Sequence, residues 1–228
     1  MKNFLLILWI SLNVFGFAQN QNSVEGAYLS KDGDTFQLWL LVDGYSSMTT
    51  FNDKEYISSI GGTYQFENNQ ITVSVEFNDQ NNSEVGTKKT YNLSFNNGNF
   101  KDENGKVWVK QNKAQSLDGT WKISARMMDG KMTEIHQKGE RKTLKLLIGG
   151  YFQWFAINPS EKSFSGTGGG TYTFENGKYT ENIQFFSRDN SRVGASLSFD
   201  GELKNGEWHH SGLSSKGEPI HEIWKRIQ

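Results

Sequence analysis

Apolar and polar residues alternate with a period of two over several short stretches of the chain. The clearest are residues 72–77, 91–95 and 195–199, and strands with one buried face show this alternation. Asn-Gly and Asp-Gly pairs recur between such stretches and permit the positive φ angles of tight hairpin turns. We find no comparable helical periodicity. The pattern predicts antiparallel strands joined by hairpins.

The second half of the chain repeats the first. Residues 61–68 read GGTYQFEN and residues 169–176 read GGTYTFEN, which is seven identities in eight positions. Shorter matches on both sides keep nearly the same spacing, and the extra residues fall where turns are expected. We therefore expect two homologous units, at 24–111 and 117–228, joined by a polar linker. Each unit has room for seven or eight strands, which predicts an all-β fold of two up-and-down barrels in tandem.

The N-terminus has the pattern of a secretory signal peptide. Lys2 precedes a nearly continuous apolar run at 4–17, and Gly16 and Ala18 place small residues where a signal peptidase reads. The run is shorter than the roughly 20 residues of a spanning helix. We expect a signal peptide at 1–18 and an exported protein, periplasmic or extracellular, with no integral membrane segment after cleavage.

Composition removes several classes of partner and chemistry. The net charge is −1 and no basic block is present, so we expect no nucleic-acid partner. The chain has no Cys, which excludes disulfides, thiol catalysis and Cys-ligated metals. The motifs of serine hydrolases, zinc proteases and P-loop proteins are missing. We expect a protein that is not an enzyme and carries no cofactor, no metal and no catalytic residue.

One sequence feature resembles a known family. Gly119-Thr120-Trp121 opens the second unit and Trp224-Lys225-Arg226 closes it. This resembles the calycin superfamily, which includes the lipocalins, and the second unit looks like secreted lipocalin-like domains of Bacteroidetes-type bacteria whose function is unassigned. The resemblance implies that Arg226 stacks on Trp121 at the barrel base, where Gly119 lets the strand bend. The first unit departs from it, with Tyr28 in place of the Trp and Lys110 in place of the Arg.

In the alternating pattern of their strands, three polar residues of the second unit fall on the same face as apolar residues that we expect to point inward. They are Glu181, His210 and Glu222. An unpaired carboxylate inside a barrel is costly, so these groups must be paired, hydrogen-bonded, protonated or ligand-bound. Three interpretations remain open: an internal network in which Arg226 neutralises Glu222, a polar group that orients a ligand, and a metal site. The metal site is the least favoured, because adjacent His residues of a strand point to opposite faces.

Aromatic residues distinguish the second unit from the first. Phe152 and Trp154 stand where the first unit has Ser46 and Met48, which predicts a more aromatic interior, either as plain core or as the walls of a ligand site. The candidate ligand-binding residues are Phe152, Trp154, Tyr172, Glu181, His210 and Glu222. Strand parity also turns Trp121, Ile123, Ala125 and Met127 inward. The insertion at 132–142 is either a lid over the barrel mouth or a loop that covers an edge.

These observations favour two functions. In the first, the exported protein binds a small, mostly apolar molecule inside the second barrel. In the second, both barrels are filled, and an exposed aromatic patch that includes Tyr151, Phe155 or Phe186 binds an envelope glycan or a protein. An enzyme built on Glu181, His210 and Glu222 is the third and least favoured alternative.

Overall fold

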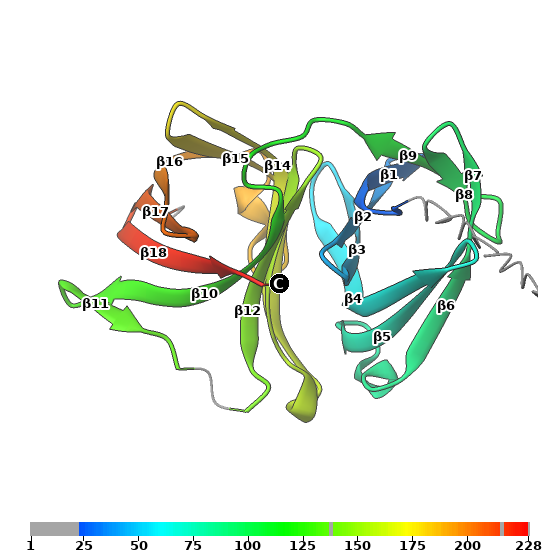
Figure 1. The fold of residues 1–228 in the computed structure, drawn as a ribbon, viewed down its shortest axis with the longest axis horizontal. Helices are drawn as coiled ribbons and strands as arrows, with labels where there is room; N and C mark the ends of the chain where they lie inside the picture. The colour runs from blue at the N-terminus through cyan, green and yellow to red at the C-terminus, as the bar shows by residue number, and fades with distance from the viewer. Residues whose placement is uncertain (1–22, 137–138, 215–216, 228) are drawn as a thin grey trace, which may run out of the picture.

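The structure, a computed structural model, describes residues 23–136, 139–214 and 217–227. They form two closed antiparallel barrels of eight strands each, in tandem along the chain (Figure 1). The predicted all-β fold is therefore confirmed, whereas the predicted signal peptide lies outside the described residues. Across the described ranges, no helix combines the length and the apolar character that a membrane crossing requires.

The first barrel contains the strands β1 to β9. Its elements are β1 (Gly26–Asp32), β2 (Thr35–Val42), β3 (Tyr45–Asn52), β4 (Tyr56–Glu67), β5 (Gln70–Asn78), η1 (Asn82–Glu84), β6 (Lys88–Asn92), β7 (Ser94–Asn96), β8 (Asn99–Lys101) and β9 (Val107–Gln111). Only Leu93 separates β6 from β7, so these two segments follow one wall of the barrel. Pairing of β9 with β1 completes the closure.

The second barrel follows the same plan with one addition. Its elements are β10 (Gly119–Met128), β11 (Lys131–Glu134), β12 (Lys142–Ile148), β13 (Tyr151–Asn158), η2 (Pro159–Glu161), β14 (Ser163–Glu175), β15 (Lys178–Phe186), η3 (Asn190–Arg192), β16 (Ser196–Lys204), β17 (Glu207–Leu213) and β18 (Pro219–Arg226). β18 pairs with β10 and closes the barrel. The added strand β11 forms a hairpin with the far end of β10.

The repeated Gly-Gly pairs mark the same bulge in both barrels. The ladder between β4 and β5 shifts register at Gly61 and Gly62, and the ladder between β14 and β15 shifts at Gly169 and Gly170. A Cβ atom on Gly62 would collide with the backbone carbonyl of Ser74. A side chain cannot fit at this bend, which accounts for the strongest sequence identity between the two units.

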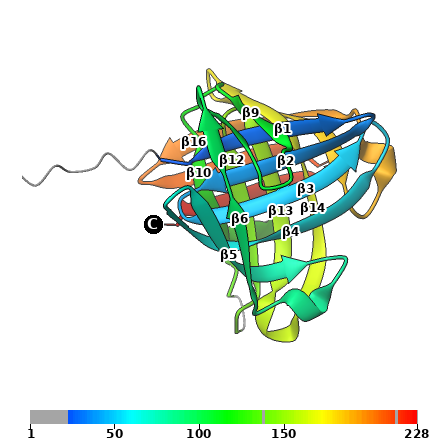
Figure 2. The ribbon, with the colours of Figure 1, turned by 90° about the vertical axis from the view of Figure 1, so that its right-hand side faces the viewer.

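The two barrels pack on each other through the outer faces of their walls. Leu38, Leu40 and Val42 of β2 share one buried apolar cluster with Leu144 and Leu146 of β12. Phe51, Phe77, Phe155, Ile157 and Phe185 extend this cluster, which we call the seam. Figure 2 shows the strands of the first barrel crossing β12, β13 and β14 steeply. Strands at the seam are therefore buried on both faces.

Polar groups at the seam are paired across it. The Ser47 hydroxyl donates to Gln153 Oε1 at 2.7 Å, and Gln153 Nε2 donates to the Ser59 hydroxyl at 3.4 Å. At the edge of the seam, the backbone N–H of Thr120 donates to Asp43 Oδ2 at 2.7 Å. These hydrogen bonds fix the register of one barrel against the other, because a buried polar group without a partner is costly.

Both barrels are closed at the base by a cation over an aromatic ring. The Arg226 guanidinium lies 4.7 Å from the centre of the Trp121 ring and donates through Nη1 to the Asp118 carbonyl at 2.7 Å. In the first barrel, Lys110 Nζ lies 5.7 Å from the centre of the Tyr28 ring. The arrangement is thus repeated in the first barrel with a different cation and a different ring.

The prediction that Met127 faces inward is wrong. Trp121, Ile123 and Ala125 are buried, but Met127 is 42% exposed. The ladder between β10 and β18 shifts register between Ile123 and Ala125, and β10 then runs beyond the barrel to pair with β11. A single bulge breaks the alternation that the prediction extended to Met127.

Candidate functional site

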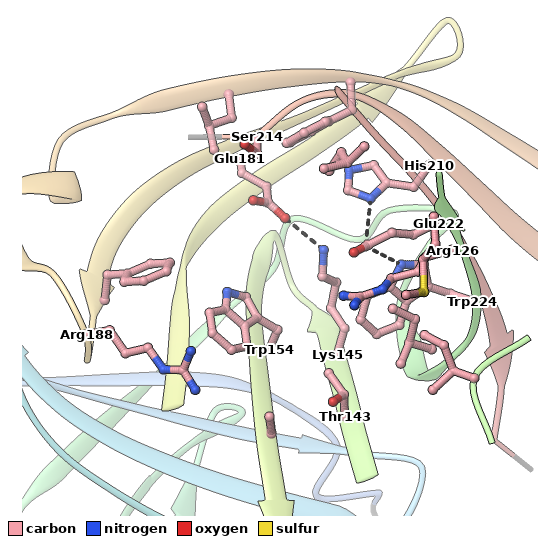
Figure 3. Close-up of a pocket in the computed structure, with 18 of the residues that line it drawn as sticks. Arg126, Thr143, Lys145, Trp154, Glu181, Arg188, His210, Ser214, Glu222 and Trp224 are labelled. Atoms are coloured by element: carbon pink, nitrogen blue, oxygen red, sulfur yellow. Dashed lines mark hydrogen bonds and ion pairs between the residues drawn. The ribbon is translucent and has the colours of Figure 1, made fainter. Parts of the chain in front are cut away.

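The second barrel contains a cavity of about 770 Å³ that lies above its base. Its apolar wall is formed by Ile123, Trp154, Ile183, Leu197, Phe199 and Ile220. Polar groups from four different strands lie among them: Lys145 of β12, Glu181 of β15, His210 of β17 and Glu222 of β18 (Figure 3). The site is therefore an apolar chamber with a polar centre.

A buried ion pair occupies the deep part of this centre. Lys145 Nζ lies 2.9 Å from Glu181 Oε1, and both side chains are less than a tenth exposed. The Tyr179 hydroxyl also donates to Glu181 Oε1 at 2.9 Å. Burial, followed by the charge of Glu181, raises the pKa of Tyr179 well above its usual value, so this hydroxyl stays a donor.

Aromatic rings surround the Lys145 ammonium. It lies 5.1 Å from the ring centres of Trp208 and Trp224 and 5.2 Å from that of Tyr179. Such contacts stabilise a cation that burial has removed from water. Together with Glu181 they explain how a lysine with 4% exposure is tolerated inside the barrel.

His210 and Glu222 form a second, looser pair. His210 Nδ1 lies 3.6 Å from Glu222 Oε2, and the Trp224 indole donates to the same oxygen at 3.1 Å. Burial lowers the pKa of His210. Burial pushes the pKa of Glu222 upward, but its contacts with His210, the charge of Lys145 and the Trp224 indole outweigh this and lower it. At neutral pH the pair is a neutral imidazole beside a carboxylate.

Four of the six predicted ligand-binding residues line the cavity, and the other two belong to the buried core of the barrel. Trp154, Glu181, His210 and Glu222 line the cavity. Phe152 and Tyr172 belong to the buried aromatic cluster of the barrel, and the Tyr172 hydroxyl donates to Asp118 near the base. The four lining residues are thus brought together around one chamber.

The network differs from the predicted one in its cations. The sequence suggested that Arg226 neutralises Glu222, but Arg226 lies on Trp121 at the base, and Lys145 supplies the buried charge. Lys145 was not among the predicted site residues. Its neighbours Leu144 and Leu146 face the seam, so Lys145 of the same strand faces the barrel interior.

Different residues occupy the equivalent positions of the first barrel. Tyr45 and Tyr151 begin the equivalent strands β3 and β13, and Trp39 and Lys145 each lie six residues before them, so Trp39 corresponds to Lys145. By the spacing of the repeat, Val73 corresponds to Glu181. The Trp39 ring packs against Tyr91, Phe100 and Trp108 with centre distances of 5.0 to 5.7 Å. Rings in edge-to-face contact thus occupy the interior of the first barrel at the level where the second has its ion pair.

The three residues named for an exposed aromatic patch have different environments. Phe155 is fully buried in the seam, so its predicted exposure is wrong; its strand lies in the wall between the barrels. Tyr151 and Phe186 are partly buried: Tyr151 packs against the seam, and Phe186 lines the cavity with its ring 5.5 Å from that of Trp154.

The insertion in the second unit lies at the mouth of the cavity. β11 extends the hairpin from β10, and Glu134, Ile135, His136 and Arg141 contribute to the cavity lining. Of the two alternatives, lid or edge cover, the position at the mouth is compatible with the lid.

The side chains of the described residues contain no group of three or more His, Asp or Glu that could hold a metal ion. His209 and His221 lie beside each other, with ring centres 6.1 Å apart, on the face of the sheet opposite to His210.

No protein-family model matches the chain, and no curated protein matches it. Among solved structures, an uncharacterized protein from Bacteroides eggerthii is similar, with 14% identity and a TM-score of 0.35. The match covers 49% of this chain and all of that protein.

Proposed function

We propose that this is an exported, non-enzymatic binding protein of the lipocalin-like type that holds a small, mostly apolar molecule inside its second barrel. One observation carries the proposal. Two barrels with the same strand order differ in their interiors, and the second keeps a cavity of about 770 Å³ where aromatic rings occupy the first. Ligand sites in proteins commonly have volumes of about 300–1,000 Å³.

The lining supports a binding role for this cavity. About half of the side chains that line it are apolar or aromatic, and the others are polar or charged, so the cavity offers both an apolar surface and groups that can orient a ligand. Lys145 and Glu181 are held by each other and by Tyr179. Because these groups are already oriented, they recognise a polar atom of a ligand at little entropic cost.

The first barrel supports this role as a scaffold. Its interior rings pack closely, and its outer wall buries the outer faces of β12 and β13. It therefore holds the ligand-binding barrel in shape, and the duplication supplies one binding unit and one supporting unit.

Native mass spectrometry of the protein from its own host, followed by denaturing mass spectrometry, tests the proposal directly. We expect an extra mass that is lost on unfolding. In parallel, the neutral fluorescent probe N-phenyl-1-naphthylamine should bind the purified protein with one site.

Variant proteins locate that probe site. Ala156→Trp places a large ring in the cavity wall and should abolish probe binding, whereas Ile57→Trp, on the exposed surface of the first barrel, should leave it intact. Circular dichroism and urea unfolding establish that both variants are folded. A protein without extra mass that also fails to bind the probe, or a probe that binds Ala156→Trp as tightly as wild type, would overturn the proposal.

A further inference from the structure

Arginine is distributed very unevenly in this chain. There are five arginines in the sequence, against 19 lysines, and all five lie in the second unit. One of them, Arg226, closes the barrel base. The other four line the cavity: Arg126, Arg141, Arg188 and Arg192.

These four arginines form a rim around the mouth of the chamber. Arg126 is near the end of β10 and Arg141 immediately precedes β12, while Arg188 and Arg192 follow β15, and Figure 3 shows Arg126 and Arg188 on opposite sides of Trp154 and Lys145. Arg126 is paired with Glu222 in the ladder between β10 and β18, so it lies beside the polar centre. A molecule in the cavity thus meets guanidinium groups on more than one side.

The charge of the rim is only partly compensated. Arg188 donates to the backbone carbonyl of Ser165, and Arg192 lies 3.3 Å from Asp189 and stacks on Phe186. Among the described residues, Arg126 and Arg141 have no hydrogen-bond or ion-pair partner. Five cationic side chains line the cavity against three carboxylates, although the whole chain has a net charge of −1.

His210 belongs to the polar centre and not to the rim. It is 2% exposed, its Nδ1 lies 3.6 Å from Glu222 Oε2, and within the described part of the chain neither ring nitrogen makes a hydrogen bond. A buried polar group without a hydrogen bond is unfavourable. The polar centre therefore has room for a further polar group of a ligand, in addition to the group held by the arginines.

We infer that the molecule bound in the second barrel is an anionic amphiphile, whose carboxylate or phosphate group is held by the arginine rim while its apolar body fills the chamber. The inference rests on the function proposed above and specifies the chemistry of the ligand. The guanidinium group presents a planar fork of donors that matches both oxyanions, which a lysine ammonium does not. This explains why arginine, scarce elsewhere in the chain, is concentrated here.

A set of three competitors tests the inference. Decanol, decanoate and decyl phosphate share one alkyl chain and differ in the head group, and each is titrated against bound N-phenyl-1-naphthylamine. We expect at least one anion to displace the probe at a concentration about ten-fold lower than decanol, as one charge-assisted contact allows. Raising the salt concentration should reduce this advantage. The better of the two anions identifies the oxyanion for which the rim is built.

Paired variants locate the anion. The double variant Arg126→Gln and Arg141→Gln, and separately Arg188→Gln and Arg192→Gln, should lose most of the anion advantage while decanol binds unchanged. The control is Lys122→Gln with Lys131→Gln, which removes the same charge from exposed positions on β10 and β11. This control should keep the advantage.

The outcomes separate this inference from the proposed function. If the probe does not bind in the cavity, the proposed function fails. If the probe binds but decanol displaces it as well as both anions do, the function stands and the anionic ligand is overturned. If the lysine control loses the advantage as fully as the arginine variants, the effect is long-range charge and the rim is not the site.

Discussion

At the level of single residues, the difference between the two barrels comes down to a few interior positions. Trp39 and Val73 of the first barrel stand where the second has Lys145 and Glu181. A large ring fills space, whereas an ion pair needs polar surroundings and leaves room beside it. At these positions the first barrel is filled by rings, and the second has an ion pair that lines the cavity.

Replacement of Lys145 by Met should be strongly destabilising. The substitution leaves the Glu181 carboxylate buried with only the Tyr179 hydroxyl as partner, and removing one member of a buried ion pair costs about 3–5 kcal/mol. Urea unfolding followed by tryptophan fluorescence measures the loss. Adding Glu181→Leu to Lys145→Met should recover most of it, because no buried charge then remains.

The matched control is Lys178→Met. Lys178 pairs with Asp200 at 2.5 Å on the surface, where both side chains are more than half exposed, and such pairs contribute about 0–1 kcal/mol. Equal losses for Lys145→Met and Lys178→Met would contradict the assigned role of the buried pair.

The inward position of Glu181 and His210 followed from sequence parity, but the role of Lys145 did not. Alternation identifies which residues share a face, and it does not say whether the other face meets water or protein. In β12 the apolar pair Leu144 and Leu146 faces the first barrel and Lys145 faces the interior, whereas an apolar set normally marks the inner face. The pattern of a single strand does not indicate that a second barrel lies behind it.

At the level of elements, the strands and their turns were the most predictable part of the fold. Asn-Gly and Asp-Gly pairs adopt positive φ at the hairpins, as at Asn97-Gly98 and Asn205-Gly206. Bulges were harder to predict, because one extra residue in a strand exchanges the inward-facing and outward-facing positions beyond it. Met127 and Phe185 both lie past such a shift and face away from the barrel interior.

Gly62→Ala tests the bulge that the repeat preserves. A methyl group at this position meets the carbonyl of Ser74 and the backbone of β5, so the strand must move, and we expect a loss of about 3 kcal/mol in the free energy of unfolding. Thr63→Ala, on the exposed side of the same strand, should change it by less than about 0.5 kcal/mol. Urea unfolding compares the two, and equal stabilities would show that the glycine is not required by packing.

At the level of the whole molecule, the seam makes one body of two repeats. Leu40 of the first barrel and Leu146 of the second are both fully buried in the same cluster. The two units were identified in the sequence by their repeat, and nothing in that repeat indicated that their outer faces meet. An apolar run such as Leu38–Val42 is typical of a strand buried on both faces, and this was the signal available.

Leu40→Ala, a substitution in the first barrel, should therefore also destabilise the second barrel. Truncation of a fully buried leucine costs about 2–5 kcal/mol. Native-state hydrogen exchange should show that the slowest amides of β13 lose as much protection as those of β2. Ile57→Ala, at an exposed position of the first barrel, should affect neither strand. Unchanged protection of β13 in Leu40→Ala would show that the barrels unfold separately.

The seam also divides the wall of the chamber into two parts that differ in rigidity. The outer faces of β12, β13 and part of β15 pack on the first barrel, whereas the outer faces of β16, β17 and β18 are exposed to solvent. Strands with solvated backs separate at lower free energy than strands packed on both faces. For the molecule that we propose to bind in the chamber, we therefore expect entry and exit through local separation of β16, β17 and β18, while the strands packed on the first barrel keep their shape.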